Sequence, residues 1–168
     1  MNIFVLDESH EDIAKAHCDK HVSKMILESA QMLCTAHWAH GSEAPYKPVH
    51  AKHPCTLWAG ESLANWLWLE GLVKALDEEF CWRYDRTVSH KSAGVVSKMH
   101  PPKNIPDHLG LTKRPQCMPD EYKVEGDVIQ AYRNYYIGEK HFAVWTKREA
   151  PSWYLEVARS VPKASSGS

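Results

Sequence analysis

The pattern of apolar and polar positions predicts a long amphipathic helix over residues 17–40, HCDKHVSKMILESAQMLCTAHWAH. At about 100° per residue, the apolar positions form a stripe wide enough to face a core: Val22, Met25, Ile26, Ser29, Leu33 and Ala36. A neighbouring stripe carries polar side chains: His17, His21, Lys24, Glu28 and Gln31. A carboxylate at a core edge is partly desolvated, and a nearby cation then tunes it for acid–base chemistry. Glu28 is therefore a candidate catalytic group, although an ordinary Lys24–Glu28 pair on a solvated face has the same spacing.

Local signals predict where the first helices begin and end. Ser9 and Asp12 have the spacing of a capping box before a short helix over residues 10–17. Asp19 is the expected N-cap of the long helix, and Gly41 is its expected C-terminal stop.

The rest of the chain predicts an all-α fold in one compact helical domain, residues 1–162, followed by a flexible C-terminal tail, residues 163–168. Residues 1–7 fit a short strand or an extended arm. The further predicted elements are helices over 56–84, 89–99, 124–141 and a short one from Pro151, with two long Pro-rich loops at 42–54 and 100–119.

Composition excludes several classes of protein. At 168 residues the length suits one domain, and no apolar run has the length of a membrane span. The opening MNIFVLD lacks the basic region of a signal peptide, so we expect a cytoplasmic protein, in the host cytoplasm if a phage encodes it. The five cysteines form no CxxC pair, which favours reduced thiols over a disulfide framework or a structural zinc site.

Charge is divided unevenly along the chain. Residues 1–82 hold 6 Lys+Arg against 12 Asp+Glu, whereas residues 83–168 hold 14 against 9. A basic second half suits an anionic partner. Its candidate DNA-binding residues are Lys113 and Arg114 in the second loop and the aromatic–basic group Lys147, Arg148, Trp153 and Tyr154. Aromatic rings between cations can stack on bases, although a terminal helix that docks its rings into the core has the same pattern.

The spacing of His17 and His21 places two imidazoles on one helix face, where they could hold a metal with a third ligand. The chain lacks the HExxH arrangement, a P-loop, a Rossmann fingerprint and a GxSxG elbow. A metal-dependent hydrolase therefore stays an alternative, and no metal site is expected.

Asp19, His21 and Glu28 form the motif D-x-H-x6-E, and residues 151–154 form the motif P-[ST]-W-Y. Both motifs, in this order, resemble those of the pyrimidine-dimer DNA glycosylases of the phage endonuclease V type. The stretch from Pro54 to Trp58 is similar to the family segment that leads into its central helix. The chain resembles a divergent bacteriophage member, and the resemblance implies an all-α single domain.

The resemblance also implies a mechanism. An N-terminal α-amine attacks the sugar C1′ of a damaged nucleotide and forms an imine, while Glu28 stabilises the sugar cation. The amine is that of Met1, or of Asn2 after removal of Met1, and His21 and Lys24 complete the catalytic set. An α-amine in an unfolded peptide has a pKa of about 7.7–8.0, so a useful fraction is neutral near pH 7.

Substrate contacts are expected beside this set. Lys20 and Lys24 are candidates for holding phosphate, and Gln31 stands where the family carries an arginine. The resemblance implies no organic cofactor and no metal, a monomer, and duplex DNA or a nucleotide as the partner.

Two further functions fit the same residues. One is a phage enzyme that modifies nucleotides or bases on this scaffold. The other is a non-catalytic module that binds nucleic acid or a host protein, in which Glu28 has only a structural role.

Overall fold

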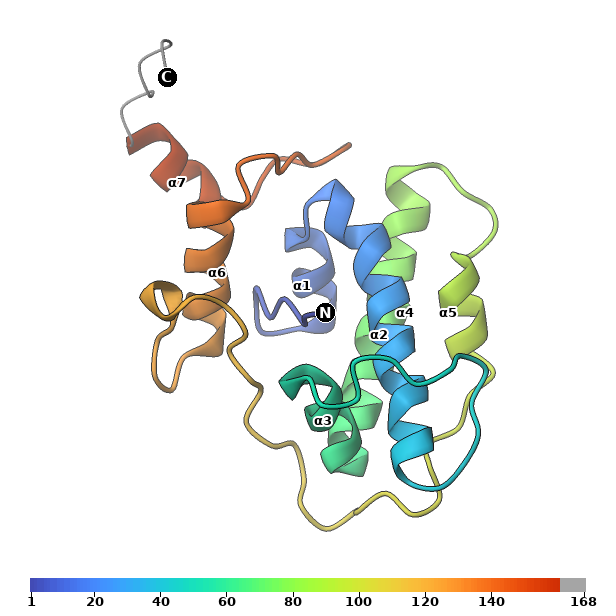
Figure 1. The fold of residues 1–168 in the computed structure, drawn as a ribbon. Helices are drawn as coiled ribbons and strands as arrows, with labels where there is room; N and C mark the ends of the chain where they lie inside the picture. The colour runs from blue at the N-terminus through green and yellow to red at the C-terminus, as the bar shows by residue number, and fades with distance from the viewer. Residues whose placement is uncertain (161–168) are drawn as a thin grey trace.

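Helices fill the chain largely where the sequence predicts them, in a computed structural model that describes residues 1–160 (Figure 1). The described residues contain no strand, which confirms the all-α prediction. The elements are α1 (His10–Ala16), α2 (Asp19–Ala39), α3 (Pro54–Glu61), α4 (Leu63–Arg83), α5 (Lys91–Val96), the 3-10 helix η1 (Asp120–Tyr122), α6 (Val128–Glu139) and α7 (Ser152–Ser160). Two long loops, 40–53 and 97–119, contain the proline-rich stretches. The predicted domain end at 162 and the tail 163–168 lie outside the described residues.

The ends of α1 and α2 follow local signals, with one correction. Ser9 Oγ accepts a hydrogen bond from the Asp12 backbone N–H at 3.1 Å, and Gly41 follows α2 with a φ of +83°. The prediction that Asp19 is the N-cap of α2 is wrong, because Cys18 holds that position. Asp19 is the first helical residue, and its carboxylate accepts a hydrogen bond from Arg83 at 3.0 Å instead of capping α2.

The predicted single helix over 56–84 is two helices, α3 and α4, which meet at Ser62. Its backbone is extended, with φ −149° and ψ 156°, and its hydroxyl accepts the Asn65 N–H at 3.0 Å as the N-cap of α4. The same hydroxyl donates to the Gly110 carbonyl at 2.8 Å. A serine that caps a new helix and also holds the second loop ends α3 at this point.

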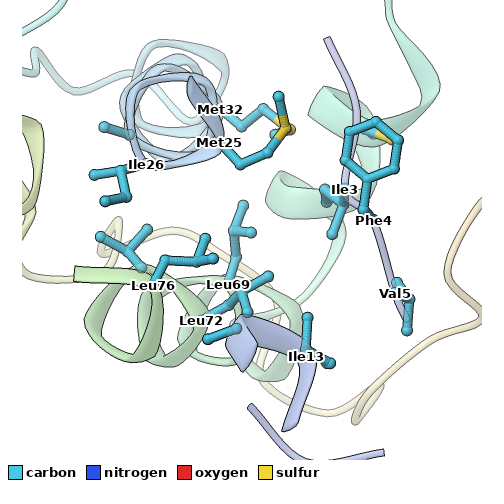
Figure 2. Packing of buried hydrophobic residues seen from close by; sticks show 14 of the residues in the cluster. Ile3, Phe4, Val5, Ile13, Met25, Ile26, Met32, Leu69, Leu72 and Leu76 are labelled. Atoms are coloured by element: carbon cyan, nitrogen blue, oxygen red, sulfur yellow. The ribbon is translucent and has the colours of Figure 1, made fainter. Parts of the chain in front are cut away.

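The N-terminal arm, residues 1–6, runs extended into the core. Its buried side chains are Ile3, Phe4, Val5 and Leu6. Figure 2 shows Ile3 and Phe4 beside Met25 and Met32 of α2, while other apolar side chains fill the space between α2 and α4. Burial of this arm removes apolar surface from water, so it holds the chain terminus inside the molecule.

The arrangement places the terminus next to the long helix. Figure 1 shows α2 and α4 side by side, with α5 on one flank and α6 and α7 on the other, and the N-terminus between α1 and α2. None of the described helices combines the length and the apolar character that a membrane crossing needs.

Candidate functional site

The α-amine of Met1 meets the side chain of Glu28 in the middle of α2. The Met1 nitrogen lies 2.9 Å from Glu28 Oε1, and the Glu28 residue is only 8% exposed. Oε1 accepts no hydrogen bond from the described residues apart from this ion pair. A largely buried carboxylate oxygen with this single close partner retains acceptor capacity for a reacting group.

Lys24 lies one turn before Glu28 and marks the solvent side of this pair. Its Nζ is 4.0 Å from Glu28 Oε2, and its side chain is 59% exposed. Met1, Lys24 and Glu28, three of the predicted catalytic residues, are therefore brought together. The exposed ammonium gives the site a positive rim beside a buried carboxylate.

Asn2 anchors the chain terminus. Its Nδ2 donates to the Cys117 carbonyl at 2.9 Å, and its Oδ1 accepts from the Tyr132 hydroxyl at 2.7 Å and from the Ile3 N–H at 2.8 Å. These bonds fix the direction in which the Met1 amine points. In the chain that begins with Met1, Asn2 is thus a positioning residue, and the amine at Glu28 is that of Met1.

His21 lies on the same face of α2 as Glu28 but packs into the core. Its ring stacks on Phe4 with centroids 4.4 Å apart, and its Nδ1 is 2.6 Å from the Tyr136 hydroxyl. Burial, with nearby positive charge, lowers the pKa of His21 to about 3. The catalytic role of His21 stays a prediction; these contacts give the residue a structural role, and two helical turns, about 10 Å along the axis, separate it from Glu28.

His17 is also a buried structural residue. Its Nδ1 lies 2.8 Å from the Ile13 carbonyl, and burial lowers its pKa to about 4. Within residues 1–160, His17 and His21 do not belong to any group of three potential metal ligands. The structure therefore offers no support for the hydrolase alternative built on this pair.

A groove of about 630 Å³ runs along α2, and neither Met1 nor Glu28 is among its lining residues; Lys24 is the lining residue that also pairs with Glu28. Its α2 wall includes Lys24, Leu27 and Gln31, which are spaced one turn apart around Glu28. The remaining lining residues are Ser23, Pro45, Tyr46, Lys47, Val49, His90, Lys91 and Ser92. With Lys24, the residues Lys47 and Lys91 give the groove three lysines, and Tyr46 adds an aromatic ring. Lys47 and Lys91 form no ion pair within residues 1–160, whereas Lys24 lies 4.0 Å from Glu28 Oε2. Sequence reasoning missed Lys47 and Lys91, because only the fold brings them to α2.

A histidine and two cysteines lie on another side of the amine. Burial lowers the pKa of His53, and the positive charge of the amine lowers it further. The Cys55 thiol donates to Cys117 Sγ at 3.6 Å. This hydrogen bond lowers the pKa of Cys117 to about 7 and raises that of Cys55.

The basic residues of the C-terminal segment are engaged within the protein. Lys147 pairs with Asp85 and donates to the Trp82 carbonyl at 2.8 Å. Arg148 forms two 2.8 Å hydrogen bonds to Glu79, a buried carboxylate. The phosphate-binding role of Lys147 and Arg148 stays a prediction, and each of these cations already pairs with a carboxylate of the protein.

The aromatic residues of α7 also pack internally. Trp153 lies 6.1 Å from the ring of Tyr136 and under the guanidinium of Arg133. The Tyr154 hydroxyl donates to the Lys140 carbonyl at 3.2 Å. Neither residue has a contact with the Met1–Glu28 pair, so the structure favours the core-docking interpretation of this segment.

The other predicted contacts lie outside the groove lining. Lys20 places its ammonium 4.8 Å from the Phe142 ring centroid, and Arg114 stacks over Trp68 at 5.0 Å. Lys113 is exposed and forms no ion pair among the described residues. Of these three, Lys113 is the cation most open to an anionic partner.

Comparisons with protein-family models, with curated proteins and with solved structures found no match for this chain.

Proposed function

We propose that this protein is a DNA glycosylase with associated lyase activity, which acts at the N-glycosidic bond of a damaged or modified pyrimidine. The observation that carries the proposal is the Met1 nitrogen at 2.9 Å from a carboxylate that is 8% exposed. An amine and a carboxylate in a largely dry site are the two groups that an imine mechanism at a sugar needs.

The proposed chemistry uses these two groups in sequence. The Met1 nitrogen attacks C1′ with its lone pair as the bond between C1′ and the base breaks, and the base leaves with a proton. Glu28 stabilises the positive charge that develops at C1′. Opening of the sugar at O4′ with loss of the amine proton gives an imine, and removal of a C2′ proton then expels the 3′ phosphate. Water finally hydrolyses the imine and regenerates the amine.

The groove supplies the binding surface in this proposal. Its three lysines, Lys24, Lys47 and Lys91, are placed to neutralise DNA phosphates, while Tyr46 and Leu27 offer surface to a base. Gln31 adds an amide that can bond to phosphate or base. The proposed DNA face is therefore the α2–α5 side of the molecule rather than the α7 side.

Replacement of Glu28 tests the proposal. Glu28→Gln keeps the shape of the side chain but removes the charge that stabilises the sugar cation. At an abasic site the C1′ hydroxyl leaves in place of the base and the same positive charge develops, so we expect cleavage of DNA that contains an abasic site to slow by at least about 100-fold, about 3 kcal/mol in the barrier, in single-turnover assays. DNA affinity, measured in parallel, should remain close to that of the unchanged protein.

A matched control is Glu78→Gln, which removes an exposed carboxylate of α4 and should cleave at the unchanged rate. Equal cleavage rates for Glu28→Gln and the unchanged protein would rule out a catalytic role for this carboxylate. A loss of DNA binding equal to the loss of rate would favour the non-catalytic binding module.

A second candidate is an enzyme that modifies free nucleotides or bases with the same amine. The groove volume of about 630 Å³ favours it, because sites for small molecules span roughly 300–1,000 Å³. Competition separates the two functions: a mononucleotide substrate would displace DNA from the groove at micromolar concentration, whereas the glycosylase would require DNA for turnover.

A further inference from the structure

Three potential metal ligands meet beside the N-terminal arm. His53 and Cys55 lie at the start of α3, and Cys117 lies in the second loop, 62 residues from Cys55. One ligand atom from each residue falls within 4.8 Å of the other two. Cys55 is fully buried, and His53 and Cys117 are half-buried.

We propose that His53, Cys55 and Cys117 form a zinc site. Two thiolates and one imidazole are a ligand set that Zn²⁺ prefers over harder cations. With Zn–S bonds of about 2.3 Å and tetrahedral angles, two zinc-bound sulfurs lie about 3.8 Å apart. The two sulfurs here are 3.6 Å apart, so a zinc ion can join them with little movement. A disulfide would require them to close to about 2.05 Å.

Among the described residues, no fourth His, Cys, Asp or Glu belongs to this group. Asn2 Oδ1 is 3.8 Å from Cys55 Sγ, but it already accepts hydrogen bonds from Tyr132 and from a backbone N–H. We assign the fourth position of the proposed site to a water molecule. His53 Nδ1 accepts the Cys55 N–H at 3.1 Å, and a metal bond at the ring takes the place of this single hydrogen bond. Zinc binding releases the thiol protons to water and needs no oxidant.

The metal would fasten two distant segments around the chain terminus. Cys117 holds the side chain of Asn2 through its carbonyl, at 2.9 Å. A zinc ion that ties Cys117 to α3 thus also holds the arm that carries the Met1 amine. The absence of a CxxC pair predicted no zinc site, because this ligand set combines an H-x-C pair with a cysteine from a remote loop. The zinc site does not depend on the proposed reaction of the amine.

Cobalt substitution tests the site in the full chain. Protein that is freed of metal and kept reduced with a phosphine should bind one Co²⁺ per chain. The complex should show the intense visible bands of tetrahedral cobalt and the near-ultraviolet band of thiolate-to-cobalt charge transfer. Zn²⁺ should remove both signals by displacement, and protein grown with zinc should contain one zinc per chain by elemental analysis.

Variants locate the ligands. Cys117→Ser and His53→Gln change half-buried side chains, and each should weaken Co²⁺ binding at least tenfold while the helical circular dichroism is kept. Cys81→Ser, a half-buried cysteine of α4 outside the site, should bind Co²⁺ like the unchanged chain.

Three results would overturn the zinc site. They are the absence of metal binding by the reduced protein, a cobalt spectrum that survives in Cys117→Ser, and a metal-free protein from a reducing cytoplasm whose mass shows a Cys55–Cys117 disulfide.

Discussion

At the scale of single residues, His17 and His21 are bases that the fold keeps neutral. Both are buried, and burial lowers their pKa values to about 4 and about 3. In the unfolded chain a histidine has a pKa of about 6.5. Below pH 6.5 the unfolded state therefore binds more protons than the folded state, so the free energy of unfolding falls as the pH falls.

This difference in proton binding predicts that the free energy of unfolding decreases as the pH falls from 6.5 to 4. Each histidine should contribute a slope that approaches about 1.4 kcal/mol per pH unit in the free energy of unfolding. Urea denaturation over this range should show a shallower slope for His17→Gln than for the unchanged chain. His108→Gln, which alters an exposed histidine, serves as control. Identical slopes for His17→Gln and the control would show that His17 is not kept neutral by the fold.

The sequence predicted the face of α2 correctly but not the depth of each residue on it. His21 and Glu28 share a stripe because seven residues make nearly two turns. Only the course of the arm decides that Phe4 covers His21 whereas the Met1 amine reaches Glu28. Helical periodicity contains no information on that course.

At the scale of elements, a chain of ion pairs fastens the start of α2 to the end of α4. Arg83 is buried, and it bonds to Asp19 at 3.0 Å and to Glu79 at 2.7 Å. Arg148 covers the other side of Glu79. Asp19 also accepts the Thr146 N–H at 2.8 Å. The segment between α6 and α7 is therefore tied to both long helices, which explains why its cations are not free.

Replacement of Arg83, which bonds to both Asp19 and Glu79, should lower the free energy of unfolding. Arg83→Leu leaves two carboxylates without their shared partner, and we expect the free energy of unfolding to fall by about 3–5 kcal/mol. The matched control is Arg86→Leu, which replaces an exposed arginine three residues after Arg83. This substitution should change the free energy of unfolding by less than about 1 kcal/mol. Urea denaturation at pH 7 measures both. Similar values for the two variants would contradict the structural role of this network.

The sequence predicted the helix ends that depend on neighbouring residues, such as those at Ser9 and Gly41. It did not predict the break between α3 and α4. Ser9 and Gly41 act through their own neighbours in sequence. Ser62 ends α3 partly by bonding to Gly110, 48 residues away, and the apolar pattern continues across it. A signal was present in the form of a serine three residues before Asn65, but the periodicity of the surrounding leucines and tryptophans concealed it.

At the scale of the whole molecule, part of the positive charge of the second half is used in ion pairs within the protein. Several of its cations neutralise carboxylates of the first half: Arg83 with Asp19, Arg148 with Glu79, and Arg133 with Asp7. The lysines left around the groove come from both halves of the chain. The uneven charge along the sequence, which suggested an anionic partner, is thus accounted for in part by ion pairs between the two halves.

The salt dependence of DNA binding should distinguish the lysines of the groove, such as Lys91, from Lys147, which lies before α7. Each phosphate contact contributes a slope of about 0.9 in the dependence of the logarithm of affinity on that of salt concentration. Lys91→Ala should reduce the slope by about this amount. Lys147→Ala should leave it unchanged, because Asp85 already neutralises that ammonium. The reverse pattern in a fluorescence anisotropy titration would move the DNA face to the α7 side.

Contacts between remote segments set the limit of prediction for the site. Helix periodicity singled out Glu28, and the resemblance suggested an amine. The sequence did not reveal that Lys91 faces α2 or that Cys117 approaches Cys55, because each contact depends on the path of a long loop. These residues lie on loops and short helices, whose positions are set by packing rather than by a repeating pattern.

Reductive trapping tests the central claim most directly, that the Met1 amine is a nucleophile beside Glu28. Incubation of the unchanged protein with DNA that contains an abasic site, in the presence of borohydride, should reduce the imine to a stable covalent adduct. Peptide mass spectrometry should place the adduct on the Met1 α-nitrogen, and acetylation of that amine beforehand should abolish trapping. An adduct on Lys24 or Lys20 would assign the nucleophile to a side chain, and the absence of any adduct would contradict the imine mechanism.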